Sequence, residues 1–448
     1  MSKSDHKAAP GPGRLLALLF FVNFLNFFDR ALPAVALEQM RAEFSLNDTM
    51  LGALGTAFVL VYAFAGIPLG RLADRTRRVS LLAVGVAVWS LLTAATGMTK
   101  NFTALLLIRL GVGVGEASCA PAANSLIGDL YPSERRSRPI GIFMLGLPLG
   151  TVTAFALGGW LVQEFGWRVP FFAAAVPGLI LAVLLWFARE PLRGAQEAAT
   201  VSAAASASTA QALARPFRTL LAIPTLWWLI LSGAGLNFAT YSLSTFLPSL
   251  LIRFHGATTA SAGVVAAIVL GLTGILGLAV GGGLADAAHR RWRRGRLAFG
   301  AIALLLAAPL VAAGLAQPAG QVVMLTVLLS SGWLLLFLYY VTVYPAIQDV
   351  VHPQLRATAM AVYFLFMYVL GGGIGTFVTG ALSDHFAAEA MQLANASAMT
   401  ESFRAVGLRQ SLLWVLPTAL LVTGLAIAGS MRTYSRDLQA ALGTKSES

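Results

Sequence analysis

The sequence predicts an all-α integral membrane protein with twelve transmembrane helices in two halves of six, and with both termini cytoplasmic. Hydrophobic residues make up 57% of the 448-residue chain, the mean hydropathy is +0.76, and only 11% of residues are charged. This composition lies well outside the range of soluble globular domains. The apolar residues also form long runs, and most of the basic residues fall between the runs on one side of the predicted membrane.

The apolar runs have the length that a membrane-spanning helix needs. About 20 apolar residues in helical conformation cross the hydrocarbon core. The chain offers twelve runs of this kind, at residues 15–37, 49–70, 79–98, 102–126, 139–163, 168–188, 222–252, 261–284, 297–316, 321–347, 357–385 and 409–431. A transmembrane β-barrel would instead show alternating segments of about ten residues. Helical spans are therefore predicted.

The net charge of +12 is explained by membrane topology. With the amino terminus inside, the segments on the cytoplasmic side hold 23 of the 31 Lys and Arg residues, and the outer loops hold six. An excess of basic residues in cytoplasmic loops is the positive-inside rule. The basic residues therefore indicate orientation in a lipid bilayer, and no nucleic-acid partner is predicted.

A low-complexity segment of small residues divides the spans six and six. Residues 197–210 are mostly Ala, Ser and Thr, a composition typical of linkers. We therefore expect a cytoplasmic tail at 1–13, an N-terminal six-helix half at 14–190, a cytoplasmic linker at 191–216, a C-terminal six-helix half at 217–432 and a cytoplasmic tail at 433–448. Cys119 is the only cysteine, so no intrachain disulfide can form.

A short motif after the second span recurs after the eighth. The first copy contains Gly70, Asp74, Arg75 and Arg78, and the second places Asp286 before another basic cluster. Glycine permits close helix approach, and an Asp can pair with basic residues or with a neighbouring helix terminus. A basic loop that only obeys the positive-inside rule is the alternative. The repetition six spans apart favours a conformational role.

Twelve spans in two halves, together with the motif at 70–78, resemble the major facilitator superfamily. The resemblance extends to Gly-Leu-Pro-Leu-Gly at 146–150 in the fifth span and to Gly-Trp-Arg at 166–168, although Arg77 stands where the motif usually carries a second glycine. It implies that the first, fourth, seventh and tenth spans line a central cavity. Substrate sites of transporters lie near the membrane midplane, at the interface between repeats.

Four charged residues lie inside the predicted spans: Asp29 and Arg30 in the first, and Arg109 and Glu116 in the fourth. An ionisable group in hydrocarbon costs at least about 2.5–3.5 kcal/mol, and it persists where it faces a partner or a water-filled path. Arg109 and Glu116 are seven residues apart, so they share a helix face roughly 10 Å apart along the axis. Basic and acidic groups that face one cavity predict an anion site beside a proton site.

The rise per residue places Asp29 and Arg109 at a similar depth, with Glu116 closer to the cytoplasm. We predict that Asp29 pairs with Arg109 in at least one state and that Glu116 is the more exposed titrating group. Burial favours the protonated form of a carboxyl group and a nearby guanidinium favours the ionised form, so breaking such a pair would move a proton. The alternative is that these charges form static ion pairs that hold helices together.

The residues around these charges resemble the spinster group of the superfamily. The segments that carry the resemblance are 26–30, Asn-Phe-Phe-Asp-Arg, and 109–121, continuing to Asp129. The resemblance implies that Asp29 and Glu116 respond to protons, that Arg109 serves substrate binding or gating, and that the substrate is a lysolipid or a sphingolipid phosphate. Arg30 is a second candidate for attracting an anionic head group. Cys119 departs from the group, in which an aromatic residue is usual at this position.

The C-terminal half offers polar and aromatic groups instead of charges. Asn237 and Tyr241 lie one turn apart in the seventh span, as do Tyr340 and Tyr344 in the tenth. Together with Asn26 of the first span, they are candidate substrate-binding residues. An aromatic wall opposite a charged wall suits an amphipathic ligand. For any one of these residues, an interfacial aromatic belt or ordinary helix packing is the alternative.

No cofactor, metal or nucleotide site is predicted. The glycine runs at 111–115 and 371–375 lack the Gly-Lys-Ser/Thr of a phosphate-binding loop, and the five histidines fall in tails, loops or span ends, which disfavours an enzyme. We expect a monomeric secondary active transporter of a bacterial inner membrane. It would move an amphipathic anionic substrate, such as a lysophospholipid or a sphingolipid-like molecule, by proton-coupled alternating access. A proton-coupled transporter of small organic anions or drugs, with the same fold, is the alternative.

Overall fold

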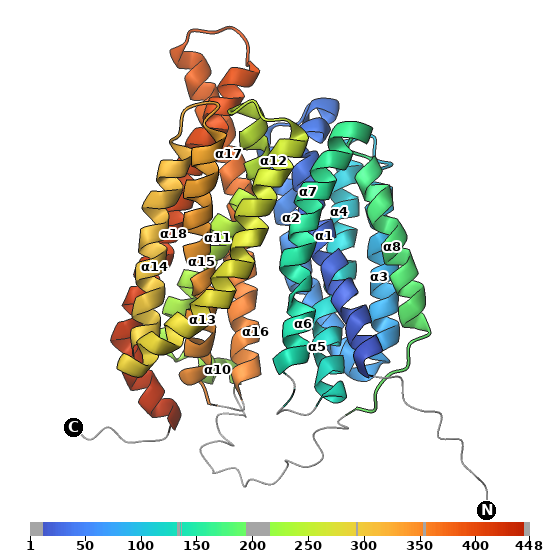
Figure 1. The fold of residues 1–448 in the computed structure, drawn as a ribbon, viewed down its shortest axis with the longest axis vertical. Coiled ribbons are helices and arrows are strands. Elements are labelled where there is room, and N and C mark those ends of the chain that lie inside the picture. Colours follow the sequence, from blue (N-terminus) through green and yellow to red (C-terminus); the bar gives the residue numbers. More distant parts are fainter. Residues whose placement is uncertain are drawn as a thin grey trace, which may run out of the picture.

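The computed structural model describes residues 12–131, 135, 137–193, 216–292, 294–352 and 355–442, and the described residues form helices and no strand. Most of the predicted N-terminal tail and most of the predicted linker lie outside these ranges; of the predicted C-terminal tail, residues 433–442 are described and continue helix α18, whereas 443–448 lie outside. Figure 1 shows two helical bundles side by side, with the start of α1 and the end of α18 at the same face. We call this face the termini face and the opposite one the far face.

The helices of the described residues form twelve spans, six in each half, as predicted. The N-terminal half contains α1 (Pro12–Phe44), α2 (Asp48–Arg75), α3 (Arg78–Thr96), α4 (Phe102–Glu116), α5 (Cys119–Leu130), α6 (Ser137–Met144), α7 (Gly146–Phe165) and α8 (Val169–Trp186). The C-terminal half contains α10 (Pro216–Leu221), α11 (Pro224–Arg253), α12 (Thr259–Ala266), η2 (Ala267–Leu272), α13 (Thr273–Arg291), α14 (Gly295–Leu315), α15 (Val322–Asp349), α16 (Arg356–Phe366), η4 (Met367–Gly372), α17 (Gly373–Leu393) and α18 (Glu401–Leu442). Four spans consist of more than one piece: α4–α5, α6–α7, α12–η2–α13 and α16–η4–α17.

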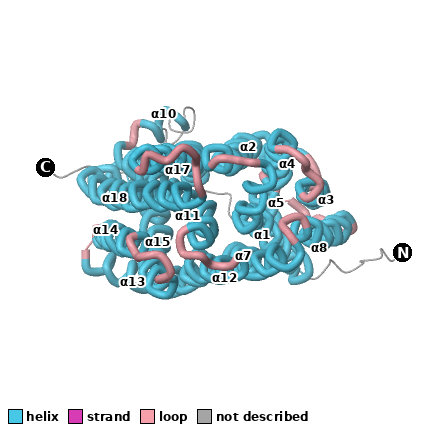
Figure 2. Tube along the Cα trace, turned by 90° about the horizontal axis from the view of Figure 1, so that it is seen from above, coloured by secondary structure: helices cyan, strands magenta, loops and turns pink. Residues whose placement is uncertain are grey.

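Helix α11 is the span that composition alone identifies least well. Eleven described helical segments are long and apolar enough to cross a membrane, and α11, with 30 residues, is not among them. Its polar side chains, such as Asn237, Tyr241 and Ser242, are mixed with its apolar ones. Figure 2 shows α11 near the centre of the molecule, beside α1. Because most of α11 is buried among other helices, it does not need a continuous lipid-facing apolar surface.

The breaks within spans have local causes and local compensation. The fifth span breaks between α6 and α7, in the glycine- and proline-containing stretch that the sequence singled out, and Asn23 of α1 donates a hydrogen bond of 2.8 Å to the carbonyl of Phe143 beside the break. Such compensation is required because a backbone group without a partner is costly in a membrane. The eighth and eleventh spans contain π-helical turns instead, at η2 and η4, a feature often found at functional sites.

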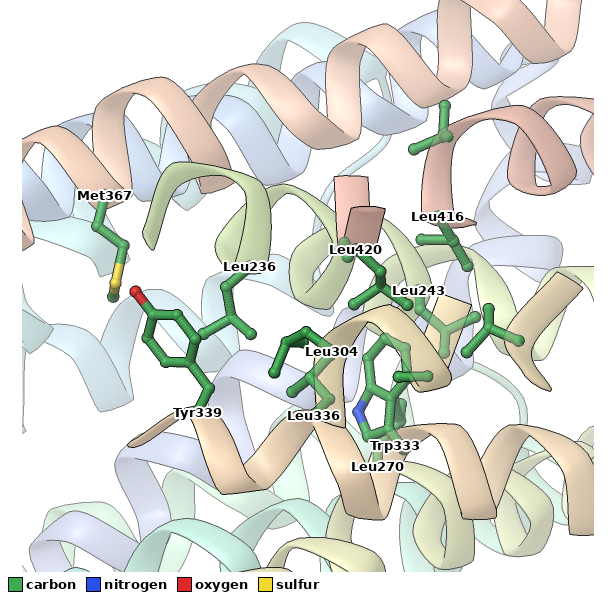
Figure 3. Packing of buried hydrophobic residues seen from close by; sticks show 14 of the residues in the cluster. Leu236, Leu243, Leu270, Leu304, Trp333, Leu336, Tyr339, Met367, Leu416 and Leu420 are labelled. Carbon is green, nitrogen blue, oxygen red and sulfur yellow. The ribbon is translucent and has the colours of Figure 1, made fainter. Parts of the chain in front are cut away.

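The C-terminal half has an extensive apolar core that includes aromatic side chains (Figure 3). Trp333 and Tyr339 of α15 are almost fully buried in it. The hydroxyl of Tyr339 lies 2.9 Å from that of Ser232 and 2.7 Å from that of Tyr363, so the polar end of this side chain is satisfied inside the core. The same core continues into the N-terminal half through residues such as Val35 of α1 and Phe155 of α7.

The two halves touch along the far face and diverge toward the termini face. Helix α2 packs against α17 and η4, and α7 packs against α12 and η2. None of residues 48–63 of α2 is exposed, whereas five residues between 64 and 72 are. The ribbons of the two halves also separate toward the termini face in Figure 1. The structure is therefore closed at the far face.

The contact between α1 and α7 generates a stability prediction. A Cβ atom added at Gly150 of α7 would collide with the backbone of Phe24 in α1, whereas one added at Gly141 of α6 would meet nothing within 4 Å. We expect Gly150→Ala to destabilise the protein by about 1–3 kcal/mol through overpacking and Gly141→Ala to be neutral or slightly stabilising. Apparent melting temperatures of the purified variants in detergent test this; equal values for the two would contradict it.

Candidate functional site

The four charges predicted inside the spans come together in the interior of the N-terminal half. Asp29 and Arg30 lie on α1, whereas Arg109 and Glu116 lie on α4, which ends at Glu116. The side chain of Glu116 is 0% exposed and that of Arg30 is 11% exposed, and the residues Asp29 and Arg109 are 2% and 6% exposed. We call these four residues the charged cluster.

An ion pair between α1 and α4 forms the centre of the charged cluster. Arg30 Nε lies 2.8 Å from Glu116 Oε2, and Asn26 Nδ2 donates a hydrogen bond of 3.2 Å to the same oxygen. Asn26 and Arg30 are four residues apart on α1, so they present their donors from one helix face. Among the described residues, the second oxygen of Glu116 has no hydrogen-bond partner and is buried. The carboxylate is therefore only half satisfied, and its free oxygen is a place where a proton can bind.

Aromatic rings on α2 surround the two guanidinium groups. The guanidinium carbon of Arg30 lies 4.0 Å from the ring centroid of Tyr62 and 5.4 Å from that of Phe58. Arg109 lies 4.9 Å from the centroid of the same Phe58 ring. Such cation–π contacts are worth up to about 2 kcal/mol when desolvated. They stabilise two cations in an apolar interior without the use of further carboxylates.

Asp29 and Arg109 are the less well satisfied members of the charged cluster. The described residues give Asp29 one long hydrogen bond, 3.5 Å from Thr93 Oγ1, and leave its other oxygen buried without a partner. Among the described residues, Arg109 forms no ion pair, and its guanidinium group lies over the Phe58 ring. The two residues lie within electrostatic range of one another and of Glu116. Arg109 is thus a buried cation with no ion-pair partner among the described residues.

Two details of the predicted arrangement differ in this conformation. The prediction that Glu116 is the more exposed titrating group is wrong, because Glu116 is completely buried. Its partner is Arg30, while the predicted pair of Asp29 and Arg109 is not formed here. The rise per residue gives the depth of a side chain but not the direction in which it points. Helix α4 ends at Glu116, and the long side chain of Arg30 crosses the gap between the two helices.

The predicted polar and aromatic residues of the C-terminal half divide into two kinds. Asn237 donates a hydrogen bond of 3.3 Å to the carbonyl of Met367 in η4, so its amide supports the π-helical turn. Tyr340 and Tyr344 stack edge to face, with ring centroids 5.4 Å apart. Tyr241 lies on α11, within electrostatic range of Arg30. Tyr241 therefore lies nearest the charged cluster, Tyr340 and Tyr344 pack against aromatic rings of their own half, and Asn237 has a structural partner.

Phe58, Tyr62 and Tyr368 belong to the site but were not predicted from the sequence. Tyr368 lies in η4, with its ring centroid 5.9 Å from that of Tyr62 in the other half and 6.3 Å from that of Tyr241. An aromatic path therefore leads from the charged cluster to the C-terminal half. Phe58 and Tyr62, four residues apart in the second span, gave a weak signal. Tyr368 gave none, because a π-helical turn shifts the helical register.

The first copy of the repeated motif acts within the N-terminal half in this conformation. Arg78, which is 3% exposed, pairs with Asp129 and, at 2.9 Å, with Glu190. It thereby joins the start of α3 to the end of α5 and to the segment after α8. Gly70 lies close to Pro121 and Arg75 is exposed; the side chain of Asp74 lies outside the described part of the structure.

The second copy of the motif likewise makes contacts within its own half. Asp286 pairs with Arg296 at 3.2 Å, and Arg296 lies 3.6 Å from Asp349 at the end of α15. Tyr434 donates a hydrogen bond of 2.8 Å to Asp349. The described contacts of both copies therefore hold helices together at the termini face of each half.

Comparison with known proteins identifies the class. Residues 19–376 match the family model of the Major Facilitator Superfamily, and the chain belongs to that superfamily of membrane transporters. It is 30% identical to a protein called MFS-type efflux pump of Mycolicibacterium smegmatis, over 97% of each chain. The protein is thus a multi-pass membrane transporter and not an enzyme.

Within the superfamily, the chain is of the spinster type. It is 30% identical to Protein spinster homolog 1 of Homo sapiens, over 83% of this chain and 74% of that one. It is also similar to the crystal structure of a bacterial homologue of the human lysosomal transporter spinster in an inward-facing and occupied conformation. That match has a TM-score of 0.83 at 28% identity and covers 98% of this chain and 100% of the other.

The buried ion pair predicts an asymmetric mutational response. We expect Arg30→Gln to destabilise the protein by about 3–5 kcal/mol, because it leaves the fully buried Glu116 carboxylate without a cation. Glu116→Gln should cost less, because glutamine still accepts from Arg30, whose guanidinium keeps its aromatic contacts. The double variant should be more stable than Arg30→Gln alone. Apparent melting temperatures in detergent measure all three.

A second ion pair of the same half provides the control for this cycle. Arg168 and Glu43 pair at 2.5 Å but are 37% and 40% exposed. Exposed pairs contribute about 0–1 kcal/mol, so the corresponding glutamine variants should lower the melting temperature little and additively. A double variant of Arg30 and Glu116 that is as unstable as the sum of its single variants would contradict the assignment.

Proposed function

We propose that this protein is a secondary active transporter that moves an amphipathic anion together with protons by alternating access. The observation that supports this most directly is the buried pair of Arg30 and Glu116, with Asp29 and Arg109 beside it. Charges inside a membrane are costly and are typical of ion and substrate pathways. The half-satisfied carboxylates are the proton sites in this proposal, and the guanidinium groups are the anion site.

The balance of charge in the cluster links the proton to the anion. With all four groups ionised, two guanidinium groups offset two carboxylates, so an entering anion adds an uncompensated negative charge. An anionic head group that approaches Arg30 also competes with Glu116 for the same guanidinium. A proton on Glu116 removes both obstacles, because it restores neutrality and releases Arg30. The anion and the proton therefore bind together more readily than either binds alone.

The surroundings of the charged cluster suit an amphipathic molecule. Arg109 supplies a cation that no described carboxylate occupies. Across the interface, Tyr241, Tyr340, Tyr344 and Tyr368 supply aromatic surface with polar hydroxyl groups. A charged head group beside α1 and α4 and an apolar body against α11 and α15 would use both walls. A lysophospholipid or a sphingolipid-like anion has this division.

The orientation of the protein belongs to the same proposal. The excess of Lys and Arg on the termini side places both termini in the cytoplasm. The far face is then the outer face, and this conformation is closed to the outside. We propose a bacterial inner membrane as the location and a monomer as the functional unit, since both halves of the site come from one chain.

A transporter of small organic anions or drugs is the second candidate. Its support is the relative called an efflux pump, which this chain matches along nearly its whole length. The two candidates share the charged cluster and differ in the apolar part of the substrate. A substrate with a long acyl chain needs the aromatic wall, whereas a small anion does not.

Reconstitution into liposomes with an imposed pH gradient distinguishes the candidates. Lysophospholipids, sphingoid phosphates and small organic anions would be offered in turn, with uptake or exchange as the measured quantity. We expect amphipathic anions to be moved and the pH gradient to increase their rate. Transport of small anions alone would select the second candidate, and transport that is indifferent to the gradient would contradict proton coupling.

Replacing Glu116 by glutamine tests its role in coupling. Glutamine keeps an acceptor oxygen for Arg30 and Asn26 but cannot bind and release a proton at neutral pH. We expect Glu116→Gln to lose the dependence of transport on the pH gradient, while exchange of substrate across the membrane persists. Glu43→Gln, which removes a paired but exposed carboxylate at the end of α1, should keep the wild-type dependence. An unchanged dependence in Glu116→Gln would exclude this residue as the coupling site.

A further inference from the structure

We propose that the far face is held closed by two symmetry-related latches, in each of which a side chain of one half caps the amino terminus of a helix of the other half. The inference goes beyond the proposed substrate and coupling ion. It rests only on the part of the proposed function in which the two halves move relative to one another.

The first latch joins α17 of the C-terminal half to α2 of the N-terminal half. Asp384 accepts hydrogen bonds from the backbone N–H groups of Asp48, at 3.0 Å, and Thr49, at 2.8 Å. It also accepts one of 2.6 Å from the hydroxyl of Thr49. Asp48 and Thr49 are the first two residues of α2. Their N–H groups have no partner within the helix, and the positive end of the helix dipole favours a carboxylate there.

The second latch joins α7 of the N-terminal half to α12 of the C-terminal half. Gln163 Oε1 accepts a hydrogen bond of 3.0 Å from the backbone N–H of Ala260. Ala260 is the second residue of α12, so this bond also satisfies an N–H group of the first helical turn. The two latches thus exchange roles: each half caps one helix and has one helix capped.

In both latches, a glycine one helical turn before the capping residue lies where the two helices approach closely. Gly380 lies four residues before Asp384, and Gly159 lies four residues before Gln163. A Cβ atom at Gly380 would meet the carbonyl of Asp48, and one at Gly159 would meet the carbonyl of Thr259 at 3.0 Å. Asp48 and Thr259 are the first residues of the capped helices. In both latches, a glycine four residues before the capping residue therefore lies against the first residue of the capped helix.

The capped helices also carry matching glycines. Gly52 lies four residues into α2 and Gly263 four residues into α12. A Cβ atom at Gly52 would meet the carbonyl of Thr376, and one at Gly263 would meet the carbonyl of Phe155. Small residues allow backbones to approach closely, and they bring each capping side chain within reach of its N–H groups. The capping residue, the glycine on its own helix and the glycine on the capped helix occupy matching positions in both helix pairs. The same structural arrangement therefore occurs twice.

The latch at α2 is reinforced by charge and the one at α12 is not. Arg253, at the far-face end of α11, lies 2.8 Å from Asp48 and 2.7 Å from Glu38 of the other half, and its side chain is 2% exposed. Ser383 also donates a hydrogen bond of 2.6 Å to Asp48. Gln163 is neutral and exposed. Opening the far face should therefore be opposed more by the Asp384 latch than by the Gln163 latch.

Distance measurements between spin labels test the latches. Labels would be placed at Lys100 and Ala319, two exposed far-face positions in different halves, in a Cys119→Ala background. The parent should give a single narrow distance distribution by double electron–electron resonance. We expect Asp384→Ala to add a population at longer distance, Gln163→Ala to add a smaller one, and the double variant to exceed both. Asp384→Asn, which keeps an acceptor oxygen but loses the charge, should lie between the parent and Asp384→Ala.

A cap that does not cross between the halves provides the control. Asn101 caps its own helix α4 at the same face, by accepting a hydrogen bond of 2.8 Å from the N–H of Ala104. Asn101→Ala should leave the distance distribution of the parent unchanged. Latch variants that elute as folded protein and give the same distribution as the parent would overturn the proposal. Because the measurement needs no substrate, it is decided independently of the transport experiments.

Discussion

The cost of placing charge inside a membrane governs the interior of the N-terminal half. Glu116 has no contact with solvent, and Arg30 offsets its charge from a different helix. This pair connects α1 to α4; the ring of Phe58 lies over both guanidinium groups and that of Tyr62 over Arg30, and among the described residues Arg109 has no ion-pair partner. Breaking the pair by removal of one partner is far more costly than losing an exposed ion pair. A change in the charge state of the cluster therefore acts on helix packing.

The charged cluster lies where the contact between the halves comes to an end. Between the far face and this level, α2 and the eleventh span approach closely through Gly52, Gly55 and Thr376. At the level of Arg30, the two halves instead touch through the aromatic rings of Tyr62 and Tyr368. Arg30 thus touches both its carboxylate partner and the ring that reaches the other half. An event at the ion pair has a short physical route to the interface.

Sequence reasoning predicted the fold well and the site in part. The twelve spans follow from hydropathy and length, and the four charges stood out because each is costly in its span. The partner of Glu116 could not be predicted, because it depends on where α4 ends and on the reach of the Arg30 side chain. Tyr368 was missed because η4 interrupts the helical period. The inter-half caps depend on tertiary contacts between residues more than 90 positions apart, and no local pattern reports them.

The two halves contribute different physical properties to one interface. The N-terminal half holds the buried charges, and Arg78 joins α3 to α5 and to the segment after α8 at its termini face. Both π-helical turns of the described residues lie in the C-terminal half, in two of the spans that contact the other half: η2 contacts α7, and η4 contacts α2. Such turns break the regular hydrogen-bond ladder and mark places where a helix bends at low cost. The N-terminal half, which holds the charged cluster, therefore packs against a half whose interface helices can bend. The charged wall of the site comes from the first half and the aromatic wall from the second.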